Sequence, residues 1–231
     1  MNQVLATCAM ILDVIATSSF TSLAEATNVV NDSEAAYTQE INRRAENIVA
    51  TLGIADSAKG AQVRAIIARQ YRDLREIHDA RDVKIKSAKG RVGPTIKVAA
   101  DAEIKAGKDT ADSRLQQLHS EYLFRLSGEL SPEQVDQVKD GMTYGVLPLT
   151  YGVYLKMYPD LTEEQRQKIK DWLAEARELA MDAGSSQEKH AWFGKYKGRI
   201  NNYLSAAGYD AKAAERNLKH ANPPLKDTKP R

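Results

Sequence analysis

One short stretch of the sequence carries a histidine, an arginine and an aspartate at a spacing that could support chemistry. His78, Arg81 and Asp82 follow an apolar stripe of three- and four-residue spacing, so a helix would place His78 and Asp82 one turn apart. Such a pair could act as a general base or as two metal ligands. The alternative is structural, because polar side chains on a buried helix face need partners on another helix. We favour the structural interpretation, so no catalytic residue is assigned and these three remain the candidates.

A second distinctive stretch runs from residue 189 to residue 203 and mixes aromatic, basic and amide side chains. Flat aromatic faces beside fixed polar groups are typical of sugar or polyanion recognition. The alternative is a core stripe with a solvated basic edge, and the sequence leaves both open. Two glycines in the same stretch, Gly194 and Gly198, predict close approach by another helix. The candidate ligand-binding residues are Trp192, Lys195, Tyr196 and Arg199, with Tyr151 and Tyr154 in support.

Other signatures of catalysis are missing from the sequence. It holds no Gly-x-Ser-x-Gly elbow, no His-Glu-x-x-His motif and no P-loop, and the four histidines show no ligand spacing. The only cysteine, Cys8, leaves no basis for a disulfide framework or a cysteine-ligated zinc. Carboxylates are plentiful, so a glycosidase-type pair stays open. We therefore expect no cofactor and no metal, and an enzyme is the less favoured interpretation.

Charge is balanced overall but uneven along the chain. The 231 residues carry 33 Lys and Arg against 31 Asp and Glu, a formal charge of +2. This balance argues against a dedicated nucleic-acid binder, because the affinity of such a protein depends on many basic side chains that displace counterions from the phosphates. Residues 185–231 hold ten basic and four acidic side chains, and such a surface suits an anionic partner.

The N-terminal segment has the features of an export signal. Val4–Leu12 is an apolar run broken only by a threonine, and Ser22 and Ala24 supply small residues where a signal peptidase would cleave. The run is too short to span a bilayer, so no stable membrane insertion is expected. We predict a signal peptide over residues 1–24, one helical domain over 25–221 and a flexible basic tail over 222–231, hence a periplasmic or secreted location.

The spacing of the apolar residues and the positions of Gly, Pro and polar capping residues predict an all-α bundle of about six to seven helices. The expected helices span residues 33–52, 57–89, 94–126, 163–183, 185–207 and 211–220, with starts after polar caps and ends at glycines. Two capping boxes, at Ser131 to Gln134 and at Thr162 to Gln165, begin two helices. An aromatic segment interrupted by Gly and Pro lies between them, and Pro148 is expected to bend or split its helix.

Three stretches together resemble a known family. Glu188 to Asp210, Tyr71 to Asp82 and Gly145 to Pro159 look like a family of exported, all-helical bacterial proteins catalogued as domain of unknown function 3826. The resemblance covers residues 35–220. It implies a sugar-binding protein of bacteria that degrade polysaccharides, and it brings no established catalytic residues. The paired Leu-Ser/Thr-x-x-Gln boxes are also similar, more weakly, to those of periplasmic chaperones of the LTxxQ type.

Three hypotheses follow. The leading one is an exported carbohydrate-binding protein acting in polysaccharide utilisation, with acidic polysaccharide among its ligands. The second is a periplasmic chaperone of the LTxxQ type. The third is a lyase or hydrolase on glycans that uses His78. The oligomeric state is not indicated by the sequence.

Overall fold

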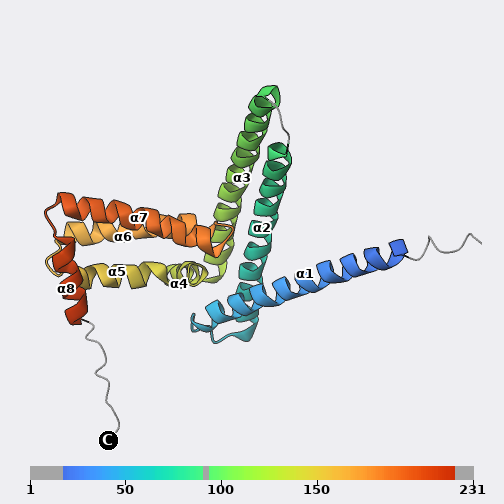
Figure 1. The fold of residues 1–231 in the computed structure, drawn as a ribbon. Helices are drawn as coiled ribbons and strands as arrows, with labels where there is room; N and C mark the ends of the chain where they lie inside the picture. The colour runs from blue at the N-terminus through green and yellow to red at the C-terminus, as the bar shows by residue number, and fades with distance from the viewer. Residues whose placement is uncertain (1–17, 91–93, 222–231) are drawn as a thin grey trace, which may run out of the picture. The chain divides into compact units, whose positions relative to one another are not determined.

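The computed structural model describes the backbone of residues 18–90 and 94–221 and the side chains of residues 33–90, 97–216 and 218. All regular structure in these residues is helical, which confirms the predicted all-α class (Figure 1). The helices are α1 (Ser18–Ala50), α2 (Ser57–Lys89), α3 (Pro94–Glu129), α4 (Pro132–Met142), α5 (Val146–Met157), α6 (Glu163–Met181), α7 (Ser186–Ala206) and α8 (Ala211–Ala221).

The chain divides into two compact units, residues 1–43 and 44–231. Within the first unit, α1 begins at Ser18 and not near Ser33, so the predicted cap at Asn31 to Ser33 is wrong. The reason is that no Gly or Pro interrupts the sequence between Ser18 and Gly53, and the polar pair therefore continues the helix. Residues 1–17 and 222–231 lie outside the described residues, so the signal peptide and the basic tail stay predictions.

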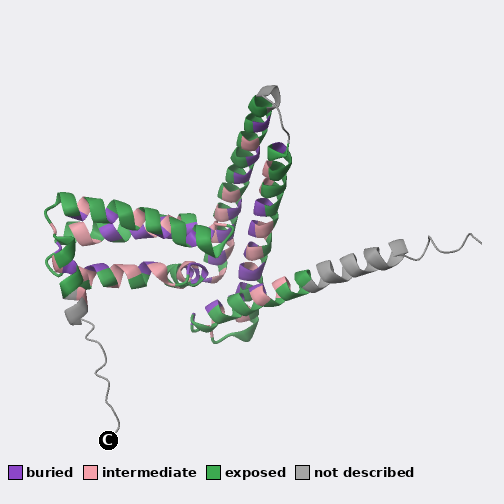
Figure 2. Cartoon of the chain, viewed as in Figure 1, coloured by how far each residue is buried: buried purple, intermediate pink, exposed green. Residues whose placement is uncertain are grey.

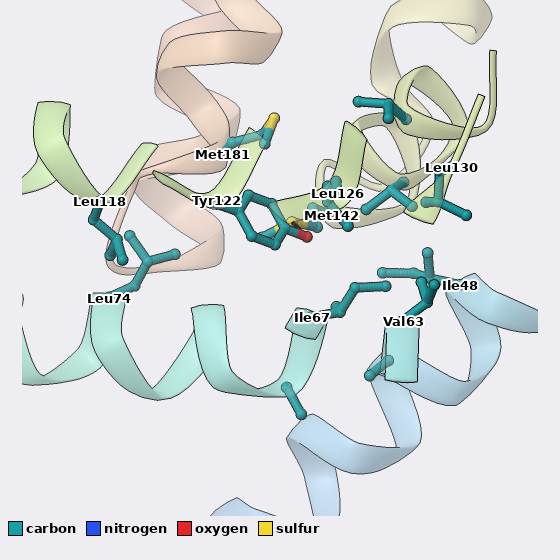
Figure 3. Close-up of a cluster of buried hydrophobic side chains, with 14 of the residues drawn as sticks. Ile48, Val63, Ile67, Leu74, Leu118, Tyr122, Leu126, Leu130, Met142 and Met181 are labelled. Atoms are coloured by element: carbon teal, nitrogen blue, oxygen red, sulfur yellow. Dashed lines mark hydrogen bonds between the residues drawn. The ribbon is translucent and has the colours of Figure 1, made fainter. Parts of the chain in front are cut away.

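In the second unit, α2 and α3 form an antiparallel pair (Figure 1). The bounds of α2 confirm the sequence prediction, and its first turn is capped by Asp56, whose carboxylate accepts from the amides of Ala58 and Lys59. The side chains of α2 and α3 form a first core cluster with α4, the end of α1 and Met181 (Figure 3). Tyr122 lies at its centre, fully buried, with its hydroxyl donating to Sδ of Met142 at 3.1 Å.

Two capping boxes begin α4 and α6, as predicted. The Ser131 and Thr162 hydroxyls accept from the amides of Gln134 and Gln165, whose side chains accept in return from the cap amides.

The break between α4 and α5 comes from Tyr144 and Gly145, both left-handed with φ of 59° and 64°. Pro148 lies in the first turn of α5, where a missing amide costs little, so the prediction that it bends or splits a helix is wrong. The separate α4 and α5 bring the described helices to eight.

A second core cluster joins α5, α6, α7 and α8. Helices α6 and α7 lie antiparallel, and buried positions recur along their facing sides (Figure 2). The α7 residues inside it are Phe193, Ile200 and Leu204, which fall on the side that the periodicity predicts. A Cβ added at Gly194 or Gly198 would meet no atom within 4 Å, so the predicted close helix approach there is wrong.

Among the described residues, no helix is both long enough and apolar enough to cross a bilayer.

Candidate functional site

The two chemically distinctive stretches of the sequence meet at one open cavity of about 680 Å³ in the second unit. His78 and Arg81 of α2 line one side of it, and Trp192 and Lys195 of α7 line another. Helix α3 and the end of α6 complete the lining with Asp112, Leu115, Gln116, Leu179, Asp182 and Ala183, and α7 adds Glu188 and Ala191. The cavity therefore collects candidates that lie more than a hundred positions apart in the sequence.

His78 is held against the C-terminal end of α6. Its Nε2 lies 2.7 Å from the backbone carbonyl oxygen of Asp182, so Nε2 carries the proton that this acceptor needs. The ring is 6% exposed, and its Nδ1 is buried without a protein partner. Gly184 leaves room for the ring, because a Cβ there would lie 2.8 Å from Cγ of His78. His78 thus fixes α2 to the turn that follows α6, and the link is to the backbone and not to Asp82.

Arg81 stands at the cavity with its charge compensated by two carboxylates. Its Nε donates to Oδ1 of Asp82 at 2.8 Å, and Nη2 lies 4.0 Å from Oε1 of Glu188. The hydrogen bond with Asp82 is the main reason that the pKa of Arg81 is raised. Asp82 itself is 62% exposed and does not line the cavity. The predicted trio is therefore split, with His78 and Arg81 at the site and Asp82 beside it.

Glu188 is positioned by the start of α7. Ser185 is the N-cap, and its hydroxyl accepts from the amide of Glu188 at 3.1 Å. The Glu188 carboxylate reaches back and accepts from the amide of Gly184 at 2.9 Å. This reciprocal arrangement resembles a capping box and leaves Oε1 directed to Arg81. A local helix-start signal therefore sets one carboxylate of the cavity.

A network of charged side chains shares Asp182 with the cavity and joins α3, α4 and α6. His119 Nδ1 lies 2.9 Å from Oδ2 of Asp182, and Nε2 lies 3.4 Å from Oε2 of Glu178. The interaction with Asp182, followed by that with Glu178, raises the pKa of His119 to about 9. Burial alone would raise the pKa of Glu178, but the bonds from His119 and Lys139 lower it to about 2. His119 is therefore a cation at neutral pH.

The same network includes a buried arginine on α6. Arg177 donates from Nη2 to Oδ1 of Asp136 at 2.6 Å and from Nη1 to Oδ1 of Asp140 at 2.9 Å. Only 8% of its side chain is exposed. In the part of the chain that the structure describes, no three histidine, cysteine or acidic side chains are arranged to hold a metal ion. The bonds of Arg177 connect α6 to α4.

Lys189 closes the end of α6 from the other side. Its Nζ donates to the carbonyls of Ala180 at 2.9 Å and Met181 at 3.1 Å. Burial lowers the pKa of Lys189 to about 8. The last carbonyls of α6 therefore meet Lys189, the next carbonyl, that of Asp182, meets His78, and a lysine at this end is favoured by the negative end of the helix dipole.

Trp192 and Lys195 form the α7 wall of the cavity. Trp192 is partly exposed, Lys195 is exposed, and the lysine Nζ lies 5.0 Å from the centroid of the indole ring. The indole is thus available to a ligand while its neighbour offers a cation. The sequence left open whether this flank of α7 faces water, and the structure places it at the surface.

Tyr196 and Arg199 lie one turn further along α7, outside the cavity lining. Arg199 is 55% exposed, and its Cζ lies 4.5 Å from the Trp172 ring centroid and 6.0 Å from that of Tyr196. These two candidates therefore border the cavity along the boundary between α6 and α7.

The tyrosines of α5 lie elsewhere. Tyr154 is buried, and its hydroxyl donates to Oδ1 of Asn201 at 2.8 Å. Burial raises the pKa of Tyr154 to about 12. Tyr151 is partly buried and packs against the second core cluster. Neither lines the cavity, and both contribute to helix packing.

Several cavity residues were not singled out from the sequence. Asp182, Gln116 and Asp112 carry no local pattern that marks them, because their roles come from contacts between distant helices. Glu188 could have been found, since the spacing from Ser185 to Glu188 is that of a helix cap.

Comparison with known proteins identifies a family. A search of curated proteins finds no match to the chain. The model of one family, described as a protein of unknown function (DUF3826), matches residues 38–221 and so includes every residue of the cavity. Because the match covers most of the chain, this protein belongs to the DUF3826 family.

Proposed function

We propose that this is an exported carbohydrate-binding protein and that the cavity lined by α2, α3 and α7 is its binding site. The observation that carries the proposal is one partly exposed indole, that of Trp192, which shares an open cavity with both hydrogen-bond donors and hydrogen-bond acceptors. Export is supported by the apolar N-terminal run and the small residues that follow it.

The size and the wall of the cavity support a sugar ligand. Its volume of about 680 Å³ lies within the usual range for sites that take small molecules. The face of Trp192 offers a flat apolar surface, on which the C–H groups of a sugar ring can pack. Trp192 is the only Trp, Tyr or Phe among the residues that line the cavity, and further apolar contacts come from Leu115, Leu179, Ala183 and Ala191.

The polar side chains around the cavity suit hydroxyl groups. A sugar hydroxyl both donates and accepts, so a sugar is bound best where donors and acceptors alternate. Arg81 and Lys195 donate, Asp112 and Glu188 accept, and the amide of Gln116 does both. The two basic and the two acidic side chains balance, and Asp182 is compensated by His119. The cavity itself therefore favours an uncharged sugar unit.

Tryptophan fluorescence tests the proposal directly. The chain has two tryptophans, so a Trp172→Phe protein reports on Trp192 alone. Titration with a panel of neutral and acidic mono- and oligosaccharides should change the fluorescence emission of Trp192, and the change should reach a plateau as the site fills. Calorimetry on the unmodified protein should give the same affinity for the neutral glycans. A folded protein that shows neither signal with any glycan of the panel would remove the proposal.

Neighbouring glutamines of α3 provide a matched pair of variants. Gln116 lines the cavity, whereas Gln117 donates to Glu121 on the exposed side of the helix. Gln116→Ala should weaken glycan binding by about tenfold, the cost of one lost hydrogen bond. Gln117→Ala should leave the affinity unchanged. Equal effects from the two variants would place the ligand elsewhere.

A further inference from the structure

We infer that the boundary between α6 and α7 extends the cavity into a second subsite, which takes the anionic unit of an oligosaccharide whose neighbouring unit lies in the cavity. This inference rests on the proposed function. It names the ligand class as a chain of sugars that carries carboxylate or sulfate groups, whereas the cavity alone suits an uncharged unit.

The second subsite is continuous with the cavity. Trp192 and Lys195 line the cavity, and Arg199 follows on the same side of α7 after one further turn. Across the boundary, Leu179 of α6 lines the cavity, and Glu175 and Trp172 follow at one-turn intervals toward the N-terminus of α6. The surface from Trp192 to Tyr203 is about 16 Å long at 1.5 Å per residue, longer than one sugar ring.

Aromatic rings support the cations along this surface. The guanidinium of Arg199 lies over the Trp172 ring at 4.5 Å, and Lys168 Nζ lies 5.5 Å from the same centroid. The ring of Tyr203 meets that of Trp172 edge to face at 5.3 Å and holds the indole in place. Stacking restricts the guanidinium, so less entropy is lost when it binds a carboxylate. Arg199 is therefore a preorganised cation with an exposed hydrogen-bonding edge.

The charges along the boundary are not balanced. Lys168, Lys195 and Arg199 are exposed cations, and the ion pairs of the described residues include neither lysine. Arg199 has one partner, Glu175, at 3.5 Å, and that carboxylate is 54% exposed. Glu175 also interacts with the Tyr196 hydroxyl, which together with burial raises the pKa of that tyrosine. Lys195 belongs to the balanced set of charges in the cavity. The two cations at the Trp172 ring, Lys168 and Arg199, face one carboxylate, that of Glu175, and this excess of positive charge attracts an anionic ligand.

A disaccharide of glucuronic acid linked to glucose and the methyl ester of that disaccharide provide a matched test. Both offer the same uncharged glucose unit to the cavity, and the ester lacks the one carboxylate charge, so the cavity should treat them alike and the second subsite should not. We expect the acid to bind about tenfold more tightly at low salt, since an Arg–carboxylate bond is charge-assisted. This advantage should shrink as salt is added, because exposed charges are screened. A sulfated trisaccharide tests whether sulfate serves as well as carboxylate, and tighter binding than its unsulfated form also supports the subsite.

Charge-removing variants locate the subsite. Arg199→Gln and Lys168→Gln should each reduce the preference for the acid over its ester and leave the affinity for the ester unchanged. Lys170→Gln is the control, because Lys170 is exposed and lies on another side of α6. Equal binding of the acid and the ester, with no effect of Arg199→Gln, would overturn the second subsite. The proposed function would still hold in that case if Gln116→Ala weakened binding of both, whereas an absence of any glycan binding would remove both.

Discussion

A methyl group added at Gly184 should separate α2 from the turn that ends α6. The Cβ of Gly184→Ala would lie 2.8 Å from Cγ, 3.0 Å from Cδ2 and 3.1 Å from Nδ1 of His78. His78 is bound at Nε2 to the carbonyl of Asp182, so its ring can retreat only by losing that hydrogen bond. The substitution therefore forces either a close contact or an unpaired buried carbonyl.

The size of the effect follows from these two costs. Overpacking a closely packed site costs about 1–3 kcal/mol. Leaving a buried polar group unpaired costs about 1–3 kcal/mol. Since relaxation avoids the larger of the two, we expect Gly184→Ala to lower the free energy of unfolding by about 2 kcal/mol. Gly194→Ala is the control, because its Cβ meets nothing within 4 Å on an exposed helix position. That variant should raise the free energy of unfolding by up to about 1 kcal/mol.

Urea unfolding followed by circular dichroism measures both variants, and a double-mutant cycle assigns the cause. In a His78→Ala background the ring is absent, so Gly184→Ala should change the free energy of unfolding by less than about 0.5 kcal/mol. The coupling between the two sites should therefore be close to the full cost of the single substitution. If Gly184→Ala were as stable as the unmodified protein, or equally costly without His78, the packing of the ring on Gly184 would be refuted.

Three further effects on the free energy of unfolding follow. The pKa of His119 is raised from 6.5 to about 9, so its contribution of up to about 3 kcal/mol is fully present below pH 6.5 and lost through about pH 9. The difference between the unmodified protein and His119→Gln in urea titrations should shrink over that range, and a constant difference would contradict the assignment. Ser131→Ala and Thr162→Ala should each lower the free energy of unfolding by about 1 kcal/mol, because each removes a helix cap. Thermal unfolding measures this effect, and a change below about 0.3 kcal/mol at both sites would contradict the capping role. Arg177→Met should lower the free energy of unfolding by at least about 2 kcal/mol, because the arginine is buried. Asp136→Asn should lower it by less than about 1 kcal/mol, because Asp136 is 61% exposed. A larger effect of Asp136→Asn than of Arg177→Met in urea unfolding would refute this argument.

Local signals predicted most of the helix boundaries. The bounds of α2, the two capping boxes and the buried side of α7 were all readable, because each depends on residues within four positions of one another. The errors arose where a local signal was overruled. Asn31 to Ser33 could have capped a helix, but the chain on either side is equally helical and α1 continues through them. Pro148 looked like a break, yet the left-handed Tyr144 and Gly145 end the preceding helix first.

The site divides in the same way between sequence and structure. Residue types and helical periodicity already marked His78, Arg81, Trp192 and Lys195, since each stands on a helix face with unusual chemistry. Their meeting at one cavity could not be predicted, because α2 and α7 are far apart in the sequence and no local pattern encodes which helices come together.

The amino-acid sequence by itself determined that this chain is helical, where most helices begin and end, and which sides of them are apolar. Those properties arise from backbone hydrogen bonds, caps and glycine positions that operate within a few residues. Only the tertiary structure decided that His78 meets the carbonyl of Asp182, 104 positions away, and that Asp182, which lines the cavity, pairs with His119. The physical reason is that side chains from separate helices come together when their shapes and charges match across the interface, and each helix alone carries only half of that match.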